Sequence, residues 1–234
     1  MYESDYSGDS LRWLNKIINL NLKLSDHETL EKLQNEIIAT KDSALAYFFA
    51  AEFRNYKPHR MQKVILDNRD PKYAFIFAQC IPNADIKALQ SVVVDSNKIK
   101  YITKFACFVK EADRKLLEKL IIKSKNVKFA HMYLKHIKEA DVNKFKRIII
   151  NSGKPRYLFE LAKHLTNKSD IDKIENLIIE SKSFIYMRLF ADKIKTANVD
   201  KIEQAVLASE NGLEIKKFAK YVRRSSMKKF LLMG

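Results

Sequence analysis

The sequence contains little glycine, proline, cysteine or tryptophan. Its 234 residues include only 4 Gly, 4 Pro, 2 Cys and 1 Trp. An average chain is about 7% glycine, and the turns of doubly wound nucleotide-binding folds and β-sandwiches use more glycine than this chain holds. The shortage of turn residues, together with abundant Leu, Ile, Lys, Glu and Ala, favours helices.

Further absences exclude several classes of site. Cys80 and Cys107 are too far apart for a CxxC motif, so we expect packed thiols rather than a disulfide framework or a zinc site. We expect His136 and His164 to be semi-buried structural residues, because ligands from other residue types do not accompany them. No phosphate-binding glycine loop, HExxH or GxSxG motif is present, so we expect no cofactor, no metal and no catalytic residues.

The chain also lacks signals for export or membrane insertion. No apolar run approaches about 18 residues, and the acidic start MYESDYSGDS differs from the basic and apolar start of a secretory signal. We therefore expect a soluble, intracellular protein of the cytoplasm that has no membrane partner.

What the sequence does contain is a repeat of about 28 residues. A small polar residue recurs with spacings of 28, 28, 28, 28, 29 and 28, at Thr40, Asn68, Ser96, Ser124, Ser152, Ser181 and Ser209. Apolar residues before it follow helical spacing, as in Leu117 and Ile121. An aromatic or leucine lies nine positions after it, at Phe49, Phe77, Phe105, Tyr133, Leu161, Phe190 and Phe218. Each unit therefore predicts a helix A, a tight turn and a helix B.

Aspartates at the start of four units predict helix N-caps, because a carboxylate accepts hydrogen bonds from unpaired first-turn amides. They are Asp85, Asp113, Asp141 and Asp170. A two-helix unit this short cannot bury its own apolar face, so neighbouring units must stack. We predict an all-α fold, a right-handed α-solenoid of about seven short helix-turn-helix repeats with helical caps. We expect one monomeric domain over residues 1–234, with a cap helix in 1–26, repeats over 27–223 and a partial helix in 224–234.

The positive charge belongs to one set of helices. Lys+Arg 44 against Asp+Glu 28 gives a net charge of +16. The fourteen-residue helix B segments carry 23 basic and 7 acidic residues, whereas the helix A segments are nearly neutral. Positions 4, 7, 11 and 14 after the small polar residue share one helical arc, and half of them are basic. The predicted nucleic-acid-binding residues on this arc are Lys100, Lys110, Lys128, Lys135, Lys138, Arg156, Lys163, Arg188, Lys195, Lys216, Lys220 and Arg223.

These residues predict a non-enzymatic binding protein whose helix B face binds a polyanion, with nucleic acid (DNA or RNA) as the favoured partner. Arg156 and Arg188 are the foremost candidates for phosphate contacts, because arginine binds phosphate bidentately. On the same arc, Tyr47, Phe75 and Phe159 are candidates for stacking on bases.

Three alternatives stay open. The lysines can form an ordinary solvated face, or the basic face can dock an acidic partner protein as a scaffold or inhibitor. A DNA glycosylase built on HEAT-like helical repeats is the third, although no catalytic aspartate flanked by aromatics is identified in this sequence.

The repeat unit resembles tandem helical repeats in uncharacterised proteins of large DNA viruses and phages. The segments 85–112 and 113–140 carry it, in the form D-x-x-x-[LI]-x-x-x-[IV]-[IV]-x-S followed by [YF]-x-x-x-[FY]-A. The resemblance covers about residues 27–223. It implies a helical-repeat fold and a viral or mobile-element origin, and it implies no site residues.

Overall fold

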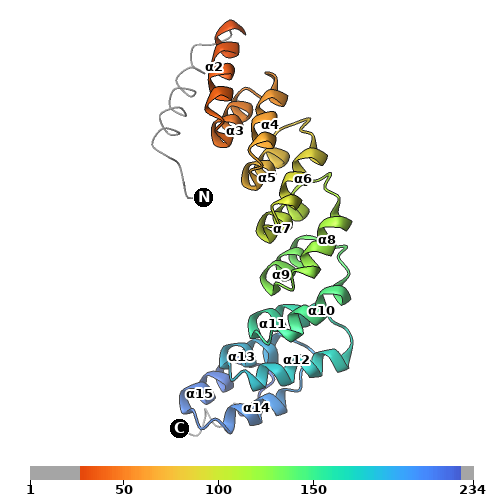
Figure 1. The fold of residues 1–234 in the computed structure, drawn as a ribbon. Coiled ribbons are helices and arrows are strands. Elements are labelled where there is room, and N and C mark those ends of the chain that lie inside the picture. The colour runs from red at the N-terminus through yellow and green to blue at the C-terminus, as the bar shows by residue number, and fades with distance from the viewer. Residues whose placement is uncertain (1–26, 228–234) are drawn as a thin grey trace. The chain divides into compact units, whose positions relative to one another are not determined.

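A computed structural model describes residues 27–227 of the chain. Within these residues it contains fourteen α-helices and no strand (Figure 1). The all-α prediction is therefore confirmed for the described part. The predicted cap helix in residues 1–26, and the end of the partial helix from residue 228, lie outside the described residues.

The chain divides into two compact units at Ser124 and Lys125. The helices of the first unit are α2 (His27–Thr40), α3 (Ser43–Glu52), α4 (Pro58–Asp67), α5 (Pro71–Cys80), α6 (Ile86–Asp95), α7 (Ile99–Phe108) and α8 (Arg114–Lys123). Helices α3, α5 and α7 pack against one another in succession, beside α2, α4 and α6, which do the same (Figure 1). Helix α8 packs against α7.

The second unit repeats this pattern. Its helices are α9 (Val127–His136), α10 (Val142–Asn151), α11 (Pro155–Ala162), α12 (Lys168–Glu180), α13 (Phe184–Lys193), α14 (Val199–Leu207) and α15 (Gly212–Tyr221). Helices α9, α11, α13 and α15 pack in succession, and α12 packs against α14 (Figure 1). Most helices have about ten residues, which is the three-turn length expected from so short a repeat. The expectation that residues 1–234 form one domain stays a prediction.

The odd-numbered helices α3 to α15 follow the small polar residues and are therefore the B helices, and they supply the aromatic core. The residues nine positions after each small polar residue are at most 2% exposed, namely Phe49, Phe77, Phe105, Tyr133, Leu161, Phe190 and Phe218. Small alanines follow most of them and are also buried, for example Ala106 and Ala191. The residues at positions 9 and 10 after the small polar residue therefore form much of the buried core.

Hydrogen bonding explains why the repeat keeps a small polar residue between its helices. The Ser96 hydroxyl donates to the Val93 carbonyl at 2.7 Å and accepts from the Lys98 amide at 3.2 Å. The Ser152 hydroxyl makes the same pair of contacts, to Ile149 and from Lys154. One side chain thus satisfies a carbonyl at the end of one helix and an amide at the start of the next.

The predicted N-caps are right in three of four cases. The carboxylates of Asp85, Asp113 and Asp141 accept from first-turn amides of α6, α8 and α10. The prediction for Asp170 is wrong. Asn167 caps α12 instead, because the 29-residue unit starts its helix earlier, and Asp170 pairs with Lys146 at 2.7 Å.

A second set of recurring polar residues, missed in the sequence, joins a 28-residue repeat to the following repeat. The buried Gln62 side chain accepts from the Asp85 amide at 2.9 Å, and Gln90 accepts from Asp113 at 2.8 Å. In the second unit, Glu175 accepts from the Asn198 amide at 2.7 Å. Each contact spans 23 residues, so a helix A side chain fixes the start of the next helix A.

Expectations for the cysteines and histidines are only partly met. Cys107 is half-buried, and burial raises the pKa of its thiol to about 12. Cys80 is exposed rather than packed, because it is the last residue of α5. His136 and His164 are also exposed rather than semi-buried. His136 is the last residue of α9, and His164 follows the C-cap of α11.

Candidate nucleic-acid interface

The turns between helices A and B have one backbone conformation throughout. The residue after each small polar position has φ between 50° and 61°, in the left-handed region. Glycine, or less often asparagine, is the usual occupant of this position after a helix. Here the seven occupants are Lys41, Arg69, Asn97, Lys125, Gly153, Lys182 and Glu210. Four of them are cations, which the backbone geometry alone does not favour.

The predicted binding residues are distributed over both units. Lys100 and Lys110 lie in the first unit, and the other ten lie in the second. All twelve except Arg188 are exposed. The Arg188 side chain is 19% exposed and pairs with Glu214, so its charge is already used within the protein. Arg156, the other foremost candidate, is exposed.

The structure corrects the arc on which these residues were placed. Position 7 of the arc points inward in three repeats, where Phe75, Thr103 and Phe159 are at most 5% exposed, whereas Lys216 at the same position is exposed. The B helices pack against one another as well as against the A helices, so this face is covered. Buried rings cannot receive a base, and stacking on Phe75 or Phe159 is therefore excluded in this structure.

A pairing of cations with aromatic rings, missed in the sequence, marks the first turn of four successive B helices. The Lys72 ammonium lies 5.0 Å from the Tyr73 ring centre, and Lys100 lies 5.4 Å from Tyr101. Lys128 over Phe129 and Arg156 over Tyr157 follow in the second unit, at 5.8 and 6.0 Å. The signal in the sequence is a basic residue followed by an aromatic at positions 4 and 5 of these four repeats. Such contacts are worth about 0.5–1 kcal/mol at exposed sites, and they hold the cation in place.

In the first unit these cations gather into a group that we call the lysine cluster, made of Lys72, Lys100 and Lys104. Burial lowers the pKa of Lys104, and the positive charges of Lys100 and Lys72 lower it further. The Lys104 ammonium also lies 5.6 Å from the Phe75 ring centre. None of the three forms an ion pair with a carboxylate of the described residues. Their charge is therefore uncompensated within the described structure.

A cleft of about 730 Å³ opens beside the lysine cluster, at the turns that precede α3, α5 and α7. We call it the turn cleft. Its cationic lining residues are Lys41, Arg69, Lys72 and Lys98. Asp42 and Asp70 also line it, but their carboxylates accept from the first-turn amides of α3 and α5.

A smaller groove of about 220 Å³ in the second unit brings together predicted residues from two helices. Lys135 of α9 and Arg156 of α11 line it with His131, His164 and Glu160. Burial lowers the pKa of His131, the positive charges of Arg156 and Lys135 lower it further, and Glu160 opposes them. Two cations against one carboxylate leave this groove positive when the histidines are neutral.

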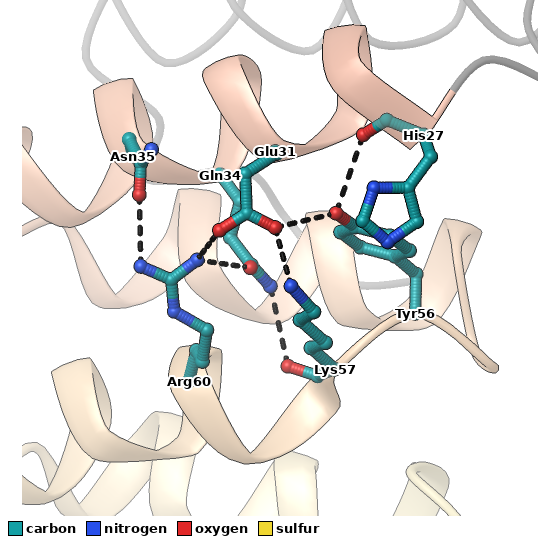
Figure 2. Close-up of polar contacts among 7 residues, drawn as sticks. All are labelled: His27, Glu31, Gln34, Asn35, Tyr56, Lys57 and Arg60. Atoms are coloured by element: carbon teal, nitrogen blue, oxygen red, sulfur yellow. Dashed lines mark hydrogen bonds and ion pairs between the residues drawn. The ribbon is translucent and has the colours of Figure 1, made fainter.

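A third charged group in the first unit is fully paired. Glu31 of α2 accepts from Lys57 at 2.5 Å, from Arg60 at 2.6 Å and from the Tyr56 hydroxyl at 2.7 Å (Figure 2). The Lys57 hydrogen bond, with that of Tyr56 second, lowers the pKa of Glu31 to about 2. Gln34 completes this Glu31 network by donating to the Lys57 carbonyl at 3.2 Å. The network ties the start of α4 to α2 and leaves no cation of its own for a ligand.

Between residues 27 and 227, His, Cys, Asp and Glu side chains do not form a group that could hold a metal ion. None of the helices described is long and apolar enough to cross a membrane. Comparison of the chain with protein-family models, with curated proteins and with solved structures finds no match.

Proposed function

We propose that this protein is a non-enzymatic, monomeric helical-repeat protein that binds nucleic acid through the basic face of its B helices. In this proposal the seven units stack as a right-handed α-solenoid, and the protein acts in the cytoplasm. The shared turn conformation, the packing of each helix against the next within each unit, and the packing of most helices against the second-next support that arrangement.

The observation that carries the proposal is the cation–aromatic pair that recurs in the first turn of α5 and α7 in the first unit and of α9 and α11 in the second. A flexible lysine loses side-chain entropy when it is fixed on a phosphate. A lysine already resting on a ring has lost part of that freedom before the ligand arrives, so binding costs less. The pairs present charge rather than hydrogen-bond patterns for base edges, which favours contacts to the phosphate backbone with little sequence preference.

Unpaired charge supports the same function. In the lysine cluster, burial lowers the pKa of Lys104, and the nearby positive charges of Lys100 and Lys72 lower it further. A polyanion relieves this repulsion, because phosphates interact favourably with every cation of the cluster.

The test is fluorescence anisotropy with labelled 20-nucleotide single strands and duplexes at 50 mM salt. We expect binding that is largely independent of sequence and that weakens as salt rises. Polyglutamate serves as a competitor that imitates an acidic protein surface. Absence of binding to every probe would overturn the proposal, and saturable binding of polyglutamate alone would favour the protein-docking alternative.

A further inference from the structure

The turn cleft holds cations at positions where the backbone would favour other residues. Lys41 and Arg69 have φ of 53° and 50°, a region that costs an L-residue energy relative to glycine. Lys98 stands at the N-cap of α7 and makes no side-chain cap hydrogen bond. A cation there faces the positive end of the helix dipole. The three residues therefore each break a local preference within one cleft.

The first unit contains one more lysine with a left-handed backbone, Lys57, and intramolecular contacts explain its presence there. Lys57 has φ of 40°, and its ammonium donates to Glu31 at 2.5 Å while its carbonyl accepts from Gln34. Lys41 and Arg69 make no ion pair with a carboxylate of the described residues. Intramolecular contacts thus account for Lys57 and do not account for the two cleft residues.

The sequence itself shows that the turn does not need these side chains. Two of the four equivalent positions in the second unit are occupied by Gly153, with φ of 61°, and Glu210, with φ of 53°, and the other two by Lys125 and Lys182. A Cβ added at Gly153 would meet nothing within 4 Å, so this position of the turn is open to solvent. Lys41 and Arg69 at this position of their own turns are exposed, so their charged groups are accessible to a ligand.

We propose that the turn cleft is a binding site for consecutive phosphate groups, those of a nucleic-acid strand, with Lys41, Arg69 and Lys98 as their ligands. The inference rests on the proposed function and adds to it a defined site outside the predicted residues. Four cations against two carboxylates give the cleft a positive charge, and both carboxylates are engaged by helix amides. A volume of about 730 Å³ accommodates more than one phosphate.

The test replaces Lys41 and Arg69 together by glycine. Glycine fits the left-handed backbone, so we expect the thermal midpoint of unfolding to stay the same or rise. Binding of a 20-nucleotide thymidine strand should weaken by about 60-fold at 50 mM salt, because each lost phosphate contact removes about 0.7 from the salt slope of a single strand. The matched control is Lys125→Gly with Lys182→Gly, which makes the same backbone change and the same charge change outside the cleft. Its affinity should fall by much less.

The outcomes separate the site from the general function. If both double variants lose affinity equally, the cleft is no discrete site, although nucleic-acid binding stands. If no oligonucleotide binds the wild type, the proposed function fails. Tripolyphosphate, measured by calorimetry, then decides whether the cleft binds phosphate from another source: loss of its binding in the cleft variant supports the phosphate site, and absence of binding overturns it.

Loss of affinity together with a lower thermal midpoint would give Lys41 and Arg69 a structural role and contradict the proposal. Lys41→Asn with Arg69→Asn is the second variant if the glycine pair does not fold, since asparagine also tolerates this backbone.

Discussion

The Glu31 network and the lysine cluster lie in the same unit and contain the same kinds of cation, yet their surroundings are opposite. Lys57 and Arg60 contact one carboxylate at 2.5 and 2.6 Å, whereas Lys72, Lys100 and Lys104 have aromatic rings beneath them and one another as neighbours. The hydrogen bond to Glu31 raises the pKa of Lys57, and the neighbouring lysines add to the lowering of the pKa of Lys104. The comparison teaches that the nearest partner, not the residue type, separates a cation that holds the fold from one that is available to a ligand.

Replacement of two cations by glutamine, in one group at a time, should give the largest difference in nucleic-acid affinity between the two groups. Lys72→Gln with Lys100→Gln removes two of the proposed phosphate contacts, and we expect single-strand affinity to fall by about 60-fold at 50 mM salt. Lys57→Gln with Arg60→Gln removes the same charge from the Glu31 network. It should lower the thermal midpoint and leave affinity nearly unchanged. Anisotropy and thermal unfolding of both variants measure this, and equal losses of affinity would erase the distinction between the two groups.

The second-largest expected effect is a loss of stability of the Glu31 network in acid. The pKa of Glu31 is about 2 in the fold and 4.5 for the unperturbed group, so the folded state favours the ionised form. Its stabilising contribution is fully present above pH 4.5 and is lost as pH falls toward 2. We expect Glu31→Gln to lower stability at pH 7 and to reduce the loss between pH 5 and 2, as measured by urea unfolding across this range. An unchanged acid profile in the variant would show that the network does not stabilise the fold.

Loss of a ring beneath a cation should have the smallest effect. Tyr101→Leu removes the surface on which Lys100 rests and retains an apolar side chain. Because a cation–aromatic contact is worth about 0.5–1 kcal/mol, we expect affinity to fall by about two- to fivefold. Tyr186→Leu is the control, since Tyr186 holds the same position of α13 but follows Ile185 rather than a cation. A loss in the control as large as in Tyr101→Leu would show that the rings do not act through their cations.

Much of the helical pattern could be predicted from the sequence because residues at the same position of successive 28-residue repeats are buried in the same way. The large apolar residue at position 9 is buried in all seven repeats, and the serine between the helices makes the same hydrogen bond in several of them, so their columns are visible without a structure. Asp170 was misplaced because one inserted residue moved the start of α12, and a column cannot show which of two polar residues takes the cap.

The candidate site was predicted less well, for a physical reason. A helical arc treats a B helix as if only one side were covered, but these helices also pack on one another, which buries Phe75 and Phe159. The chemistry of Arg188 suits a phosphate contact, but its partner Glu214 lies 26 residues away in the sequence and becomes a neighbour only through packing. Lys41 and Arg69 belong to the turns, where the sequence gives no sign that their backbone is left-handed.

The salt dependence of single-strand binding tests the central claim most directly. Plots of log K against log salt should be linear for the wild type, for Lys72→Gln with Lys100→Gln, and for Lys57→Gln with Arg60→Gln. We predict that the slope becomes shallower by about 1.4 in the lysine-cluster variant, two contacts at about 0.7 each, and stays unchanged in the Glu31-network variant. Three equal slopes, or a wild type that binds no strand at 50 mM salt, would contradict the account.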